Sequence, residues 1–204
     1  RAKIKKTSHL LLELINEVLD MSKLESDEVV LEDIPFNLNS IFEEILGVIE
    51  HMAAEQNIRI IWEEKEVTHW NLIGSPVHVK RILMNILSNA VKYNKENGYV
   101  YISCREISSK QTAMTTLEFV CRDTGIGMTE AFQKRIFEPF AQEHAGSRRK
   151  FAGTGLGMAI SKKLVEKMGG TITFESKKGV GTTFVIRVPF KIDPDADKRE
   201  EQKD

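Results

Sequence analysis

Two strand-like runs, residues 98–107 and 115–123, constrain the fold most strongly, because only a short polar segment joins them. Runs this close in the chain pair as antiparallel neighbours. Other short apolar runs bounded by turn residues are expected to join the same sheet. These runs lie at residues 29–36, 58–62, 69–73, 171–176 and 182–190. The pattern therefore predicts a mixed, largely antiparallel sheet.

Two strong amphipathic helices are predicted beside these strands. Ser75 and the proline after it provide a capping hydroxyl and a proline at the first helical position, and the helix that follows ends near Tyr93. The other helix covers residues 154–168 and is closed by the pair Gly169-Gly170. Each helix has a single apolar face that needs a sheet to cover.

Two further helices complete the predicted set. One ends near residue 54 and is capped by Asn37 or Asn39, and a short one covers residues 129–136. With the long helices on one face of the sheet, the order of elements defines an α+β fold.

The first segment, residues 3–25, predicts one long helix with a broad apolar stripe. Its seam and flanking positions are Ile4, Thr7, Leu10, Leu11, Leu14, Ile15, Val18, Leu19, Met21 and Leu24. A stripe this wide is typical of a four-helix bundle rather than a bare two-stranded coil. A single helix cannot bury it, so we expect a partner helix outside this chain. The alternative is that the helix packs on its own domain.

Composition limits the class of protein. The chain has 204 residues, of which 41% are apolar and 29% charged, with a formal net charge of -1. This suits a soluble domain with an appendage and shows no basic excess of the kind that nucleic-acid binding requires. No apolar run reaches membrane-spanning length and the start is not a signal peptide, so a cytoplasmic location is expected, with any membrane anchor lying upstream. Cys104 and Cys121 form no metal-binding pattern and are expected to be reduced.

One helix carries a polar face that suits a metal and a phosphate chain. Asn85, Asn89 and Lys92 lie at positions i, i+4 and i+7 and therefore share a face opposite the apolar one. Mg²⁺ prefers oxygen ligands and keeps several waters, so amide oxygens suffice when phosphates supply the rest. The alternative is an ordinary solvated helix face.

Three glycine-containing segments accompany that face. Asp123 leaves a buried strand end and is followed by glycines that permit close approach of the backbone to a flat ring, although the segment also suits a plain strand-to-helix turn. Residues 153–158 open a helix, where backbone N–H groups form an anion site, but they match neither a Walker A loop nor a Rossmann fingerprint. Residues 179–184 alone indicate a hairpin turn.

Taken together, these segments resemble the sensor histidine kinases of the GHKL ATPase superfamily over residues 8–190. The N, G1, F, G2 and last glycine boxes are similar to Asn85–Tyr93, Asp123–Gly127, Phe137–Phe140, Gly153–Gly157 and Gly179–Thr182. The boxes are specific as a set, whereas each is weak alone. The start of the chain resembles the second helix of the family's dimerisation and phosphotransfer stem.

The resemblance implies a Bergerat-type ATP-binding α/β sandwich preceded by one stem helix. It divides the chain into the partial stem at residues 1–26, the catalytic domain at 27–192, and a charged, disordered tail at 193–204. The implied cofactors are ATP and Mg²⁺. The implied partners are the stem, a homodimer partner and the receiver domain of a response regulator, with neither nucleic acid nor membrane contacted by this part. A bacterial source is expected.

The resemblance also assigns site residues. Asn89 is the main Mg²⁺ ligand with Asn85 beside it, Lys92 contacts phosphate, Tyr93 stacks on adenine, and Asp123 accepts from the adenine amine. Phe137 and Phe140 anchor one end of a lid at residues 138–153, where cations steady the β- and γ-phosphates. The remaining implied binding residues are Gly125, Gly127, Met128, Arg148, Arg149, Lys150, Gly153, Thr154, Gly155, Leu156, Gly157 and Thr182.

The implied reaction is transfer of the γ-phosphoryl group of ATP to a histidine, then to a response-regulator aspartate. Asn85 stands where the superfamily's hydrolases have a glutamate base, which favours transfer to an imidazole over hydrolysis. No histidine here has the context of the phosphoacceptor, so no catalytic residue is assigned and this part of the chain is not expected to phosphorylate itself. The alternatives are a nucleotide sensor without transfer activity, a conformational ATPase, and a serine kinase of the anti-sigma type.

Overall fold

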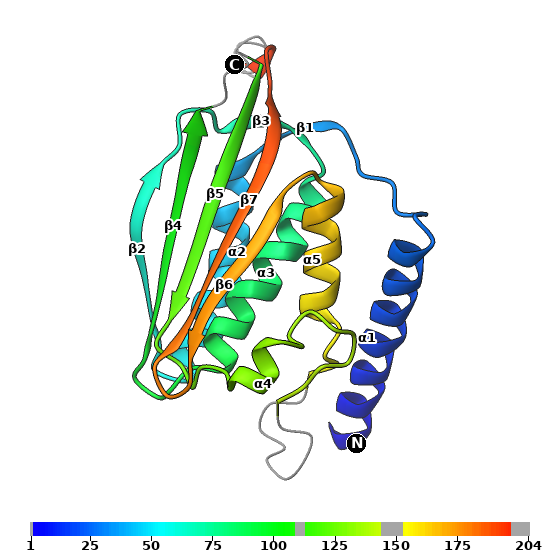
Figure 1. Ribbon diagram of the computed structural model, residues 1–204, viewed down its shortest axis with the longest axis vertical. Helices are drawn as coiled ribbons and strands as arrows, with labels where there is room; N and C mark the ends of the chain where they lie inside the picture. The colour runs from blue at the N-terminus through cyan, green and yellow to red at the C-terminus, as the bar shows by residue number, and fades with distance from the viewer. Residues whose placement is uncertain (1, 109–112, 144–152, 197–204) are drawn as a thin grey trace.

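The structure is a computed structural model that describes residues 2–108, 113–143 and 153–196 (Figure 1). Its helices are α1 (Ala2–Glu25), α2 (Leu38–Ala54), α3 (Pro76–Lys92), α4 (Glu130–Gln133) and α5 (Gly157–Lys167). Its strands are β1 (Ile34–Asn37), β2 (Arg59–Glu66), β3 (Asn71–Gly74), β4 (Tyr99–Ser108), β5 (Met114–Asp123), β6 (Thr171–Lys177) and β7 (Gly181–Ile192). The predicted tail beyond residue 196 lies outside the described residues.

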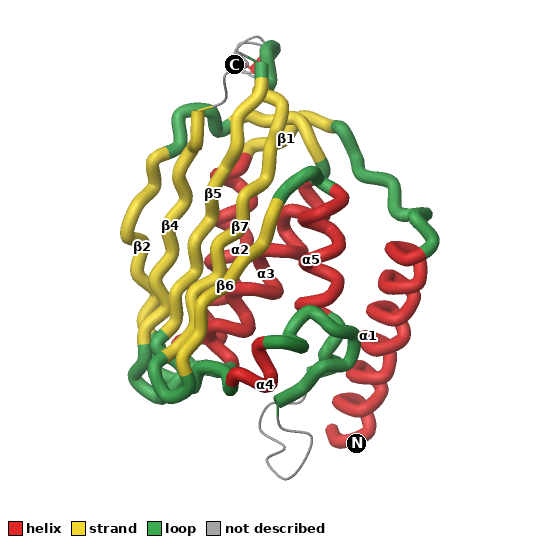
Figure 2. Tube along the Cα trace, in the orientation of Figure 1, coloured by secondary structure: helices red, strands yellow, loops and turns green. Residues whose placement is uncertain are grey.

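The seven strands form one sheet in the order β1-β3-β7-β5-β4-β2, with β6 also paired to β7. All pairs are antiparallel except β2 with β4, which are joined by a crossover through β3 and α3. α2, α3 and α5 lie on one face of the sheet, as Figure 2 shows. The predicted α+β fold is therefore confirmed, including the antiparallel pairing of β4 with β5, whereas the polar segment predicted to join them lies largely outside the described residues.

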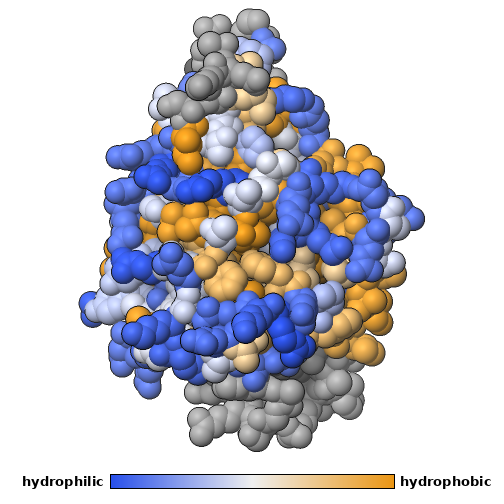
Figure 3. Space-filling model, viewed as in Figure 1, coloured by the Kyte–Doolittle hydropathy of each residue, from blue (hydrophilic) through white to orange (hydrophobic). Residues whose placement is uncertain are grey.

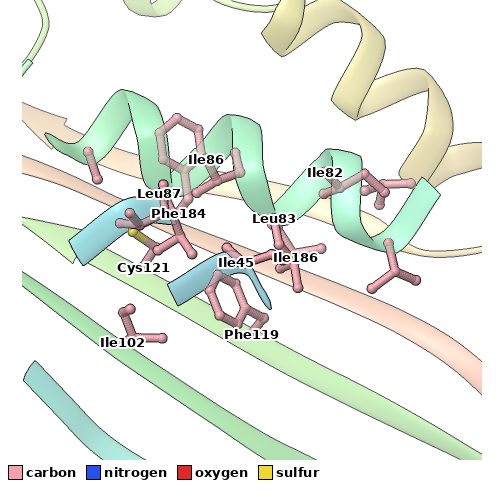
Figure 4. Close-up of a cluster of buried hydrophobic side chains, with 14 of the residues drawn as sticks. Ile45, Ile82, Leu83, Ile86, Leu87, Ile102, Phe119, Cys121, Phe184 and Ile186 are labelled. Carbon is pink, nitrogen blue, oxygen red and sulfur yellow. The ribbon is translucent and has the colours of Figure 1, made fainter. Parts of the chain in front are cut away.

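The core lies between these helices and the sheet. Figure 4 shows Ile86 and Leu87 of α3 directed toward Ile102 on β4, Cys121 on β5 and Phe184 on β7, all of them buried. Full burial of one such aliphatic side chain stabilises the fold by roughly 1.5–3 kcal/mol. Both cysteines are free and buried. The packing of its apolar face fixes α3 on the sheet, and the polar face of α3 is therefore directed away from the sheet.

The two predicted helix caps have different outcomes. The Asn37 side chain accepts a hydrogen bond from the Ser40 N–H at 3.2 Å, so Asn37 rather than Asn39 caps α2. Ser75 precedes α3 as expected, but its hydroxyl makes no capping bond. It bonds instead to Nδ1 of His78 at 2.6 Å, because the imidazole three residues later reaches the hydroxyl. The prediction of a capping Ser75 hydroxyl was wrong.

α1 packs on the domain through one narrow side. Met21 is buried and Leu24 is half-buried against the core. Ion pairs join the same side to α3 and α5: Asp20–Arg81 at 2.7 Å, Glu25–Lys163 at 4.0 Å, and Asp27–Lys167 just beyond the helix.

Several apolar side chains of α1 are exposed, and Figure 3 shows apolar side chains at the edge of the molecule where α1 lies. The exposed residues include Leu11, Leu12, Ile15, Val18 and Leu19. Packing on its own domain thus accounts for one side of the helix, and the partner helix expected for the exposed side stays a prediction. No helix within the described ranges is long and apolar enough to cross a membrane.

Candidate nucleotide-binding site

The polar face of α3 is arranged as its spacing predicts. Asn85, Asn89 and Lys92 are all half-buried, and Nδ2 of Asn89 donates to Oδ1 of Asn85 at 3.4 Å. Nζ of Lys92 lies 5.0 Å from the centroid of the Tyr93 ring, which is 38% exposed. Two carboxamides and one ammonium group therefore follow one another along the face, ending at an accessible aromatic ring.

The glycine loop before α5 runs along this face. A Cβ at Gly157 would lie 2.4 Å from Oδ1 of Asn85, and one at Gly153 would lie 2.7 Å from Nζ of Lys92. α5 begins after Leu156, which cannot cap with its side chain, so the first backbone N–H groups of the helix receive no side-chain cap. Uncapped N–H groups at the start of a helix, preceded by a loop whose first glycine lies beside a lysine, make a site suited to an anion.

Asp123 lies at the end of β5, beside the C-terminal end of α3. Its Oδ1 accepts hydrogen bonds from the N–H groups of Gly125 at 2.7 Å and Thr182 at 3.3 Å. Burial raises the pKa of Asp123 to about 6, against the opposing effect of these hydrogen bonds and of Lys95. A Cβ at Gly125 would lie 2.4 Å from the carbonyl oxygen of Tyr93, so this turn rests on the C-terminal end of α3.

The turn between β6 and β7 is locked to the turn after Asp123. Gly127 and Gly181 have φ of 58° and 142°, and a Cβ at either would lie 2.0 Å from a backbone oxygen of the opposite turn. The N–H of Met128 donates to Oγ of Ser176 at 2.9 Å. Residues 179–182 thus form the hairpin turn that their local pattern indicated, and they also hold Asp123 in place.

Two residues that support this junction were not singled out from the sequence. Ser176 accepts from Met128 and shares a 2.9 Å hydrogen bond with the hydroxyl of Thr182. Gln133 donates through Nε2 to the carbonyl oxygens of Met128 at 3.1 Å and Ser176 at 3.0 Å. Neither position follows a local pattern, since one contact of each residue, Ser176 with Met128 and Gln133 with Ser176, joins segments more than forty residues apart.

The structure brings Asn85, Asn89, Lys92, Tyr93, Gly125, Gly153 and Gly157 together along α3. Asp123, Gly127 and Thr182 lie where the two turns join, beside the end of that helix. The other described residues lie elsewhere: the Leu156 and Met128 side chains are in the core, the Thr154 hydroxyl donates to Glu17 of α1, and Gly155 packs on the backbone of Phe140. Arg148, Arg149 and Lys150 lie outside the described residues.

The F-box residues behave differently from one another. The Phe137 ring packs edge-on against Phe174 at 5.7 Å between centroids. Phe140 has φ of 61° and its side chain is 61% exposed. Phe137 therefore anchors the start of the predicted lid segment, and the Phe140 ring does not.

The donor set fits a metal that is shared with phosphate. Among the described residues, no group of three or more His, Cys, Asp or Glu is placed to hold a metal ion. Within the same residues nothing donates a hydrogen bond to Oδ1 of Asn89, and Lys92 has no carboxylate partner. An amide oxygen suits a hydrated Mg²⁺ when phosphate oxygens complete the metal's shell, and the Lys92 ammonium group can pair with those same phosphates.

Comparison with known proteins agrees with this geometry. The family described as histidine kinase-, DNA gyrase B-, and HSP90-like ATPase matches residues 74–192, and the chain belongs to it. Within that family the chain is a histidine kinase ATPase catalytic domain, as its named relatives indicate.

Two curated relatives illustrate the likeness. The chain is 37% identical over 191 residues to signal transduction histidine-protein kinase BarA of Escherichia coli (strain K12), covering 94% of this chain and 21% of that protein. It is 36% identical over 183 residues to sensor histidine kinase GacS of Pseudomonas protegens, covering 90% of this chain and 20% of that protein. The chain thus spans about a fifth of these relatives.

Two solved structures have the same fold. Full-length ShkA in complex with AMPPNP matches with a TM-score of 0.76 and 26% identity, over 94% of this chain and 38% of that one. Histidine kinase ThkA in complex with the response regulator TrrA matches with a TM-score of 0.65 and 25% identity, over 95% of this chain and 50% of that one. The resemblance noted in the sequence is confirmed.

Proposed function

We propose that this chain binds Mg-ATP and transfers its γ-phosphoryl group to a histidine on a stem helix outside the chain, for onward transfer to a response-regulator aspartate. The observation that carries the proposal is the placement of Asn85 and Lys92 directly against the glycine loop at residues 153–157, with Asn89 between them on the same face. That placement supplies amide oxygens, an ammonium group and free backbone N–H groups along one face.

Each site residue has a proposed role. Asn89, with Asn85 beside it, holds Mg²⁺, which neutralises charge on the phosphates when bound. Lys92 contacts phosphate and the ring of Tyr93 stacks on adenine. Asp123 accepts a hydrogen bond from the adenine amine. Gly125, Gly127, Met128 and Thr182 line the base pocket, residues 153–157 border the triphosphate, and Arg148, Arg149 and Lys150 are candidates for the phosphate-binding cations.

The transfer step makes few covalent demands on the protein. A ring nitrogen of the acceptor imidazole attacks the γ-phosphorus, the bond to the β–γ bridging oxygen breaks, and ADP leaves with that electron pair. The protein positions the chain of phosphates and offsets its charge. Asn85 has no basic group, and Nδ2 of its carboxamide already donates to Ser161, so it is unsuited to activating a water.

The proposed organisation follows the exposed stripe of α1. Residues 1–26 form part of a stem that pairs with a further stem helix and with a second subunit, residues 27–192 form the catalytic domain, and residues 193–204 form a tail. The exposed Leu11, Ile15 and Val18 support this division, since an apolar stripe on a helix requires a partner. A receiver domain is the proposed second protein partner, and a cytoplasmic location is proposed.

Calorimetric titration with ATP tests the proposal. The parent chain should bind with micromolar-to-millimolar affinity in Mg²⁺, and Asn89→Ala should lose most of the gain that Mg²⁺ provides. A parent chain whose affinity is the same with Mg²⁺ and with a chelator would refute the assigned site. In the full-length protein, label from the γ-position of ATP should appear on histidine. Bound ATP without such transfer would favour a nucleotide sensor.

A further inference from the structure

The nitrogen of the Asn85 carboxamide is held by the neighbouring helix α5. Its Nδ2 donates to Oγ of Ser161 on α5 at 2.8 Å and lies 3.6 Å from Sδ of Met158, also on α5. Ser161 is buried, with 1% of its surface exposed. The hydroxyl that accepts from Asn85 is therefore screened from water and fixed by the packing of α5.

This contact determines which way the carboxamide faces. With its nitrogen turned toward Ser161, the Asn85 oxygen faces Asn89, whose Nδ2 donates to it at 3.4 Å. Gly157 leaves room for that oxygen, since a Cβ there would lie 2.4 Å away. A buried amide N–H that lost its acceptor would favour rotation of the carboxamide, which would turn the nitrogen toward the open side.

The same contact joins the two halves of the proposed site. Asn85 belongs to the helix with the metal-binding face, whereas Ser161 lies one turn beyond the glycine loop at the start of α5. The distance between the amide face and that loop is thus set by a hydrogen bond between side chains. Hydrogen bonds of this kind orient ligand side chains, and their loss weakens metal affinity.

We infer that Ser161 is a positioning residue for Mg-nucleotide binding, acting through Asn85: it keeps the carboxamide oxygen of Asn85 directed toward Asn89. This inference rests on the proposed function. It adds a residue outside the polar face of α3, and it explains why a hydroxyl occupies a buried position on the apolar side of α5.

Removing the hydroxyl tests the inference. Ser161→Ala should weaken nucleotide affinity in Mg²⁺ by about fivefold, while affinity in a chelator stays unchanged, because only the metal-dependent part uses the amide oxygens. Ser161→Cys, which retains a weak acceptor, should give a smaller loss and guards against a folding defect in the alanine variant. Ser88→Ala is the matched control, since its hydroxyl donates to the backbone oxygen of Asn85 at 3.2 Å and leaves the side chain alone; it should bind like the parent.

A double-mutant cycle separates positioning from general structure. In the Asn85→Ala background, Ser161→Ala should have no further effect, because its route to the nucleotide is already gone. An equal loss in both backgrounds, or no loss in either, would overturn the inference. If Asn85→Ala itself left Mg²⁺-dependent binding intact, the proposed role of Asn85 would fail first.

A readout in the nucleotide-free protein completes the test. The side-chain NH₂ signals of Asn85 can be assigned by their disappearance in Asn85→Ala. In the parent they should be shifted and protected from solvent exchange by Ser161. In Ser161→Ala they should move toward the values of an exposed carboxamide and exchange faster. Unchanged Asn85 signals in Ser161→Ala would show that the hydroxyl does not hold the side chain.

Discussion

The carboxylate of Glu17 on α1 accepts a hydrogen bond from the hydroxyl of Thr154, between the first two glycines of the glycine loop. A carboxylate from the first helix therefore lies next to the segment proposed to border the triphosphate. Asp20 of the same helix pairs with Arg81 on α3 at 2.7 Å, so α1 contacts both the glycine loop and the helix that carries Asn85 and Asn89.

Removal of the Glu17 charge is expected to strengthen ATP binding. A carboxylate beside a polyphosphate is unfavourable, and the effect of one partly exposed charge is about 1 kcal/mol or less, which corresponds to about a fivefold change in affinity. Glu17→Gln should therefore bind ATP up to fivefold more tightly, with a smaller gain for ADP, as measured by titration calorimetry. Glu25→Gln removes the same charge from the same helix near Lys163 and should bind like the parent. Weaker ATP binding in Glu17→Gln would show that the carboxylate supports the loop.

The pKa of Asp123 predicts how nucleotide affinity depends on pH. Burial raises this pKa to about 6, and acceptance of an adenine amine needs the ionised carboxylate. ATP affinity should therefore fall as the pH drops below 6, approaching roughly tenfold per pH unit if the protonated form does not bind. Asp123→Asn should bind weakly at all pH values and lose that dependence. A parent affinity that is constant between pH 7.5 and 5 would contradict the assigned role.

The same carboxyl group should lower the stability of the nucleotide-free domain at neutral pH. A raised folded-state pKa means that its contribution to stability is complete below the unfolded value of 3.8 and is lost as the pH rises through about 6. Asp123→Asn keeps an oxygen for the N–H groups of Gly125 and Thr182. At pH 7.5 this variant should melt at a higher temperature than the parent, and at pH 4 the difference should shrink. Equal shifts at both pH values would exclude the carboxylate as the cause.

The pKa of Glu106 is shifted in the opposite direction to that of Asp123. Burial alone would raise its pKa, but hydrogen bonds from His69, Thr115 and the backbone of Thr68 lower the pKa to about 2. Its stabilising effect should thus be present above the unfolded value of 4.5 and be lost as the pH falls toward 2. Glu106→Gln should destabilise the domain by about 1–3 kcal/mol at pH 7 in urea unfolding. Glu63→Gln, at an exposed pair with Arg122, should change stability by less than about 1 kcal/mol.

Local patterns predicted the parts of the fold that depend on near neighbours in the chain. The apolar face of α3 and its row of Asn85, Asn89 and Lys92 follow from spacing within one helix, and the antiparallel pair β4–β5 follows from the short segment between the two strands. The role of Gly181 in holding Asp123 could be found only by combining separate segments, since alone it is a hairpin glycine.

The specific partners of polar side chains could not be predicted in this way, whether those partners lie near in the chain or far away. Ser75 was expected to cap its helix by its type and position, yet the side chain of His78 competes for its hydroxyl. Ser161 and Gln133 carry no local signal, because each acts on a partner that only the folded chain brings near. The division of the α1 stripe into a packed and an exposed side likewise depends on how the segment between α1 and β1 positions the helix against the domain.

A small apolar cavity between α2, α3 and the sheet predicts one stabilising substitution. The cavity has a volume of about 40 Å³, and Val79 on α3 is among the residues that line it. Val79→Ile adds one methylene to existing space and should stabilise the domain by up to about 0.8 kcal/mol in urea unfolding. Val91→Ile on the same helix is the control, because Val91 is fully buried and does not line the cavity. There the added methylene has no space and should destabilise by about 1–3 kcal/mol. Equal effects of the two substitutions would mean that the cavity closes in solution.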